Sequence, residues 1–206
     1  MKKTVICNIP MVRKKPMIYS STDADLPAST EPVLYPVNSL LAETLQKDDI
    51  VKVLLLTKNA TNDHSKENVA SFTAEIEKVC GKTMAQLESI KEINTEFSED
   101  KKVHETLLSK IVDEIEVGEH IIVDITHGSK DMPIIAFTAL NFAETYLKCE
   151  IDNIVYGQAE FNDENQPINT KLCDMAALYY LNSITNTISC ASPEKAKELL
   201  KGMLSL

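Results

Sequence analysis

The chain has 206 residues, enough for one compact domain with a proper hydrophobic core, and 44% of them are hydrophobic while 25% are charged. This composition excludes a largely disordered chain. The formal net charge of −10 argues against a protein that wraps duplex nucleic acid, because neutralising the phosphates of a duplex needs a broad basic face.

The first quarter of the chain predicts a strand, a long loop, a helix and a second strand. Residues 4–7 form a short apolar strand that Asn8-Ile9-Pro10 ends. The loop that follows, residues 11–34, is rich in proline, serine and threonine, and a loop of this length in a compact domain is usually functional or mobile. Residues 38–45 have helical spacing, and 51–56 are a second apolar strand. These elements make one βαβ-like unit.

The middle of the chain continues the alternation. Apolar residues recur at helical intervals from Val69 to Val79, and Gly81 is expected to end that helix. Residues 90–97 predict a third strand, and residues 103–115 predict the next helix. His104 falls off the apolar stripe of that helix, so we expect it to be solvated.

The most informative stretch comes next. Ile121 to Ile125 lack the polar alternation of a half-exposed strand, so the strand is expected to be central and parallel. Gly128 allows a sharp turn, Asp131 is a plausible helix N-cap, and Pro133 fits the first helical turn. Free backbone N–H groups and the positive end of a helix dipole then favour an anion. The residues placed there are Thr126, His127, Ser129 and Lys130, although turn and cap roles alone would also explain them.

The remaining residues predict a helix at 134–146, a strand at 151–157 and a polar turn at 162–166. A helical stripe is expected from Leu172 to Ile188, for core or dimer packing, and a last helix follows Ser192. We expect a domain at 1–190 with a helical extension at 191–206.

Cysteine, histidine and apolar patterns exclude several further classes. The five cysteines are widely spaced without a C-x-x-C pair, which indicates buried thiols in a reducing compartment. The four histidines lack paired zinc-site spacing, so we expect no metal and no cofactor. No apolar run has membrane-spanning length, and the first is too short for a signal peptide. The expected location is the cytoplasm, with no membrane partner.

The order Asp124-x-Thr126-His127-Gly128 resembles the DxTHG motif of the CARF domains of type III CRISPR systems, Rossmann-like sensors of cyclic oligoadenylates. In that family, too, the motif ends a buried strand and precedes a helix. The resemblance covers 1–190 in layout and is motif-specific only around 124–133. It implies a homodimer whose paired crevices hold one ring, most often cyclic tetraadenylate, with residues 126–130 on ribose and phosphate. Many relatives have a glycine-rich loop where this chain has Asn8-Ile9-Pro10.

The predicted fold class is α/β, Rossmann-like, with a mainly parallel five- or six-stranded sheet and helices on both faces. In the strand order 3-2-1-4-5, strands one and four meet at the switch point, where ligands bind beyond the carboxyl ends. A basic, acid-free start to the chain suits a small polyanion there, although a solvated basic loop is the alternative. The expected ligand-binding residues are Asn8, Ile9, Pro10, Arg13, Thr57, Thr126, His127, Gly128, Ser129, Lys130 and Tyr156.

Three functions remain open. The first is a sensor that binds cyclic oligoadenylate, and the second is a metal-independent ring nuclease in which a ribose 2′-hydroxyl attacks the adjacent phosphodiester. In the second, Lys130 and Ser129 would hold the phosphate, and His127 would act as a general acid or base or only donate a hydrogen bond. The third is an unrelated Rossmann-like nucleotide or sugar-phosphate protein. Because no effector-sized segment follows the predicted domain, we expect a stand-alone protein or a sensor acting through a separate effector chain.

Overall fold

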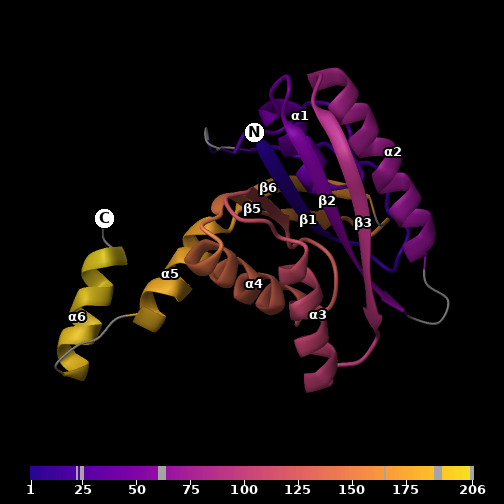
Figure 1. Cartoon of the computed structure of the whole chain (residues 1–206). Helices are drawn as coiled ribbons and strands as arrows, with labels where there is room; N and C mark the ends of the chain where they lie inside the picture. Colours follow the sequence, from indigo (N-terminus) through magenta and orange to yellow (C-terminus); the bar gives the residue numbers. More distant parts are fainter. Residues whose placement is uncertain (22, 24–25, 60–63, 165, 188–191, 205–206) are drawn as a thin grey trace. The chain divides into compact units, whose positions relative to one another are not determined.

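Six strands form the centre of the computed structural model, which describes residues 1–21, 23, 26–59, 64–164, 166–187 and 192–204 (Figure 1). The strand order is β3-β2-β1-β4-β5-β6. The elements are β1 (Lys2–Asn8), α1 (Pro36–Thr44), β2 (Ile50–Asn59), α2 (Ser65–Thr83), β3 (Gln86–Glu96), α3 (Lys101–Asp113), β4 (His120–Asp124), α4 (Met132–Tyr146), β5 (Glu150–Phe161), β6 (Pro167–Asp174), α5 (Ala176–Thr187) and α6 (Pro193–Leu204).

The predicted α/β fold class and strand order are confirmed. Strands β3, β2, β1, β4 and β5 are parallel, and β1 lies between β2 and β4. The apolar residues of β1, β2 and β4 are buried on both sides of the sheet, which is why their sequences lack polar alternation.

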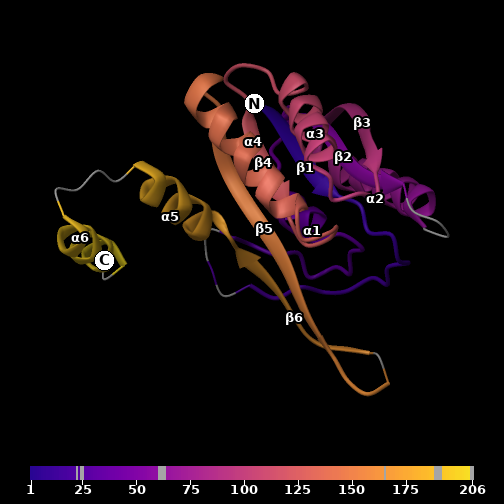
Figure 2. The same cartoon turned by 90° about the horizontal axis from the view of Figure 1, so that it is seen from below.

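Two helix pairs cover the two faces (Figures 1 and 2). Helices α1 and α2 pack over the face that carries Val5, Cys7 and Val53, within one continuous apolar core. Helices α3 and α4 pack against each other over the opposite face. The loops that follow β1 and β4 therefore leave the sheet between the layer of α1 and α2 and the layer of α3 and α4.

The last strand corrects the predicted helix at 172–188. Residues Pro167–Asp174 form β6, which pairs antiparallel with β5 after the turn that follows Phe161, and the hairpin extends beyond the helices (Figure 2). Leu172 is buried as a strand residue, so its helical spacing to Met175 was coincidental. Helix α5 begins only at Ala176, and Ile188 lies outside the described residues.

Helix α2 is longer than predicted. It runs through Gly81 to Thr83, and the C-cap residue Met84 adopts the left-handed conformation at φ 60°. Glycine in a helix interior costs only about 1 kcal/mol, which the packing of Phe72, Ile76 and Val79 offsets.

The chain divides into two compact units, Met1–Asp174 and Met175–Leu206. This boundary precedes the one predicted at residue 190, and the assignment of a ligand-binding domain and an extension stays a prediction. The sheet and the helices α1 to α4 all belong to the first unit.

Candidate functional site

The carboxyl ends of β1 and β4 lie side by side, as predicted from the topology. Cys7 pairs with Asp124 in the parallel register, so Asn8 and the turn after β4 leave the sheet together. Gly128 has a φ of 95°, and an ideal Cβ built on it would lie 3.4 Å from the Asn8 Cβ and 3.0 Å from the Met132 Cγ. The turn therefore needs glycine for its backbone and for its close packing.

Asp124 ties this turn to helix α1. Its carboxylate accepts the Thr126 N–H at 2.8 Å and the Val37 N–H at 3.1 Å, from the first turn of α1. Burial raises the pKa of Asp124, while these N–H groups and the nearby Lys14 act against that rise. The carboxylate thus satisfies a helix N-terminus, whose positive dipole end favours an anion.

Thr126 ties the same turn to β5. Its hydroxyl oxygen accepts the Gly157 N–H at 2.8 Å. A Cβ on Gly157 would lie 2.3 Å from the Pro36 Cγ and 3.0 Å from the Tyr19 Cε1, so only glycine fits between α1 and the loop after β1. The role of Thr126 seen in the structure is structural, and its contact with a ligand stays a prediction.

His127 is half-buried beside Tyr35, whose ring meets it edge-on with centroids 6.4 Å apart. Burial, with a smaller effect of Lys14, lowers the pKa of His127 to about 3. The imidazole is therefore neutral at physiological pH, which favours the hydrogen-bonding role over general acid–base chemistry. His127 Nε2 and Asn8 Oδ1 are buried and have no hydrogen-bond partner within the described part of the chain. Buried polar atoms without partners need an explanation, and a ligand or bound water supplies one.

Lys14 also lies near the turn, although its sequence context does not single it out. Its side chain is half-buried, and burial lowers its pKa. It lies close enough to Asp124 and His127 to lower the pKa of both. Among the described residues its ammonium makes neither an ion pair nor a hydrogen bond. Between Arg13 and Lys15 in the sequence, nothing distinguishes it from its neighbours.

The other predicted residues of the loop after β1 have structural contacts. Ile9 is buried and its N–H donates to the Leu56 carbonyl at 2.9 Å. Pro10 is also buried. Arg13 does not join the crevice residues, because its exposed guanidinium pairs with Glu67 on α2 at 3.1 Å.

The predicted residues on β2, β5 and the turn differ in accessibility. Thr57 is buried, and its hydroxyl donates a hydrogen bond at 2.8 Å to the carboxylate of Glu92 on β3, away from the switch point. Tyr156 is 39% exposed, immediately beyond the register pair of Asp124 and β5. Lys130 is exposed on the turn, and Ser129 is half-buried there.

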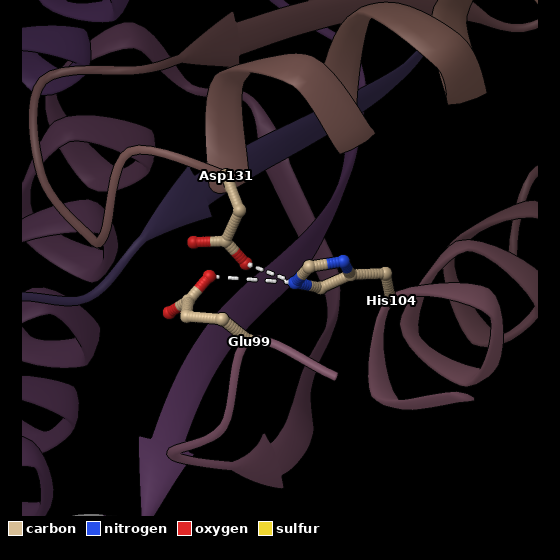
Figure 3. Close-up of side chains that lie close together, drawn as sticks. All are labelled: Glu99, His104 and Asp131. Carbon is tan, nitrogen blue, oxygen red and sulfur yellow. Dashed lines mark hydrogen bonds and ion pairs between the residues drawn. The ribbon is translucent and has the colours of Figure 1, made fainter. Parts of the chain in front are cut away.

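A polar cluster, formed by Lys58, Glu99, His104 and Asp131, flanks the turn on the α3–α4 side. Figure 3 shows the three members Glu99, His104 and Asp131. Asp131 occupies the predicted N-cap position of α4, but its side chain does not cap the helix. It binds Lys58 Nζ at 3.0 Å and His104 Nε2 at 3.3 Å, and Glu99 is 3.1 Å from Lys58 and 3.4 Å from His104. The prediction that His104 is merely solvated is therefore wrong.

This cluster is not a preformed metal site, although ligand atoms of Glu99, His104 and Asp131 lie within 4.8 Å of one another. The buried ammonium of Lys58 already supplies the positive charge between the two carboxylates, and it would repel a metal ion. The second such group, His120 with Glu150 and Asp152, has the same composition, because buried Lys3 lies 3.0 Å from Asp152. That group is at the amino ends of β4 and β5, far along the strands from the turn.

A pocket of about 510 Å³ lies elsewhere, between residues 29–34, α1 and α2, and none of the predicted site residues lines it. Its lining includes Glu75, which accepts the Leu34 N–H at 2.7 Å and so helps to hold the start of α1. The pocket gives no reason to move the candidate site away from the switch point.

Comparison with protein families agrees with the geometry. The model for CRISPR system endoribonuclease Csx1, CARF domain, matches residues 31–160 of the 206. The chain belongs to the Csx1 CARF-domain family. The matched region includes β4 and the whole turn, whereas β1 and Lys14 precede it. A comparison with curated proteins found no match. No helix in the described part of the chain is both long and apolar enough to cross a bilayer.

The tight packing at Gly157 is tested by Gly157→Ala, which we expect to destabilise the CARF domain by about 1–3 kcal/mol, because the new methyl group displaces Pro36 and the start of α1. Gly81→Ala is the control, since a Cβ there meets nothing within 4 Å and should stabilise α2 by about 0.5–1 kcal/mol. Urea unfolding measures both. Equal changes in the free energy of unfolding for Gly157→Ala and Gly81→Ala would show that the space around Gly157 is not confined.

The neutral state of His127 predicts a specific loss of stability in acid. Between pH 6.5 and 3 the unfolded chain binds a proton on this residue that the folded CARF domain does not, so the free energy of unfolding falls as pH falls. Relative to His127→Gln, the unmodified protein should lose up to about 1.4 kcal/mol per pH unit between pH 6 and 4. Urea unfolding at several pH values measures the difference, and parallel curves for the two proteins would contradict it.

Proposed function

We propose that this CARF domain binds a cyclic oligoadenylate, most simply cyclic tetraadenylate, and acts as a cytoplasmic sensor in type III CRISPR signalling. The proposed site is the crevice between the loop after β1 and the turn after β4. The observation that carries the proposal is the position of Lys14, a half-buried cation that no other described residue pairs with, beside the family's motif residues Asp124 and His127.

Three features of the crevice suit ribose and phosphate. Lys14, which lies close enough to His127 to lower its pKa, and Lys130, exposed on the turn, provide positive charge. The buried His127 Nε2 and Asn8 Oδ1 lack partners among the described residues, so small local movements would make them available for hydrogen bonds. A neutral imidazole can donate or accept a hydrogen bond without competing for the charge of a phosphate.

The charge distribution favours a compact polyanion over a long one. The net charge of −10 repels an extended RNA, while the local cations attract a ring that touches only the crevice. The buried lysines elsewhere are neutralised internally: Lys3 by Asp152, Lys52 by Glu119 and Lys58 by Asp131. Lys14 differs from them, because it is half-buried and has no carboxylate within ion-pair distance in the described part of the chain.

The proposal includes a homodimer, because one crevice covers only part of a two-fold symmetric ring and an isologous pair would complete it. The stripe predicted from Leu172 to Ile188 for core or dimer packing is shorter than expected, since Leu172 belongs to β6 and α5 begins at Ala176. Helix α4, which begins at the turn, also exposes Ile134, Phe142 and Tyr146, which are eight and four residues apart and therefore lie along one face. An exposed apolar stripe of this kind suits a protein interface, and an effector on a separate chain is compatible with it.

Binding is tested by Lys14→Met, with Lys15→Met as a control that removes the same charge from an exposed neighbour. Loss of one charge-assisted contact to phosphate should weaken cyclic tetraadenylate binding about 10- to 100-fold, while the control should change it less than about 2-fold. Calorimetric titration measures affinity and should give one ring per two chains. Equal effects of the two substitutions would contradict the site, and one ring per chain would contradict the shared crevice.

Cleavage of the bound ring is the second candidate, favoured by Lys130 on the turn and by Lys14 near His127. Attack of a ribose 2′-oxygen on phosphorus would expel the 5′-oxygen, which takes up a proton, and leave a cyclic phosphate end. Lys14 and Lys130 would stabilise charge on the phosphate without a metal. A histidine with a pKa of about 3 is poorly suited to protonate the leaving oxygen at neutral pH. Sensing is therefore the better supported function.

We expect cyclic tetraadenylate and cyclic hexaadenylate to stay intact when incubated for hours with the protein in excess EDTA, because the imidazole of His127, with its lowered pKa, is neutral and not available as the acid. Chromatography of the products over time decides this. Cleavage that persists in EDTA and disappears in Lys14→Met would establish a ring nuclease and contradict the expectation.

A further inference from the structure

The segment before Lys14 is held at residues 10–12 by the start of α2 and its N-cap residue His64. The side-chain amide of Asn68 donates to the Pro10 carbonyl at 2.6 Å and to the Val12 carbonyl at 3.0 Å. Between them, the Met11 carbonyl accepts the His64 N–H at 2.9 Å. Three consecutive carbonyls therefore point at the same helix start, and the backbone of this segment is firmly placed.

The direction of the side chains alternates at this point. Arg13 points to α2 and pairs with Glu67. Lys14, the next residue, is half-buried and lies near Asp124 and His127, on the crevice side. The two neighbouring cations thus have different surroundings because the backbone before them is fixed.

Asn68 is the most buried of the residues that hold the segment. It is only 4% exposed, whereas the Arg13–Glu67 pair is exposed on both sides and contributes little. Its own carbonyl accepts the Tyr35 hydroxyl at 2.7 Å, and Tyr35 flanks His127. Asn68 therefore contacts both the segment before Lys14 and Tyr35, the residue beside His127.

We propose that Asn68 is a positioning residue of the messenger site, which acts through Lys14 by fixing the backbone at Pro10 and Val12. This inference rests on the proposed function. The amide suits the task because its two N–H groups serve two carbonyls at once, which a carboxylate or a hydroxyl cannot do. Without it, two carbonyls lose their donor, and the segment can relax towards water and carry Lys14 away from the crevice.

The test is a double-mutant cycle with Asn68→Ala and Lys14→Met, each alone and combined, in calorimetric titration with cyclic tetraadenylate. Asn68→Ala should weaken binding about tenfold, and the double variant should bind no more than about 2-fold more weakly than Lys14→Met alone. The slope of log affinity against log salt should also decrease in Asn68→Ala, as in Lys14→Met, because one phosphate contact is lost. A merely structural role would leave that slope unchanged.

Ile111→Val is the stability control, a buried change in α3 on the other face that should lower stability by about 1 kcal/mol without changing affinity or slope. If Asn68→Ala does not fold, Asn68→Ser replaces it in the cycle. If the losses of affinity in the two single variants multiply in the double variant, or if Asn68→Ala leaves the salt slope unchanged, the positioning role is overturned. The Lys14 site would still stand. Absence of binding by the unmodified protein would overturn the proposed function itself, and the positioning role with it.

Discussion

The buried carboxylate of Asp124 is the interaction on which the candidate site depends. It ends β4, accepts N–H groups from Thr126 and Val37, and so joins the turn to the start of α1. Charge-assisted hydrogen bonds contribute about 1.5–3 kcal/mol each, and a buried carboxylate without them would take up a proton. The shape of the turn, the position of α1 and the electrostatics felt by Lys14 all follow from this one charged group.

The buried lysines elsewhere in the protein are paired with carboxylates, and Lys14 at the crevice differs from them. At the amino ends of the strands and beside α4, lysines are neutralised by carboxylates within 3.0 Å, which makes those regions stable scaffold. At the crevice the pattern changes, since Lys14 and Asp124 influence each other beyond ion-pair distance. A partly buried cation that is not neutralised by the fold is well placed for a phosphate, and this distinguishes the crevice from the rest of an acidic protein.

The sequence predicted the sheet well because the buried parallel strands are apolar throughout and are separated by clear turns. Residues 172–188 were misread because Leu172, in a strand, has helical spacing to the apolar residues after it. The sequence favours Arg13 as strongly as Lys14, because Glu67, which pairs with Arg13 away from the crevice, is 54 residues away in the chain. The low pKa of His127 and the contacts of His104 likewise depend on burial and on distant residues, which local pattern does not report.

The central claim is that the turn anchored by Asp124 and the cation Lys14 form a site for a compact adenylate ring. Calorimetric titration of the unmodified protein with cyclic tetraadenylate and with linear tetraadenylate of the same base composition tests it most directly. We expect the ring to bind at least about tenfold more tightly than the linear tetraadenylate, a difference of about 1.4 kcal/mol in binding free energy. Equal affinity for the two, or no binding of the ring, would contradict it.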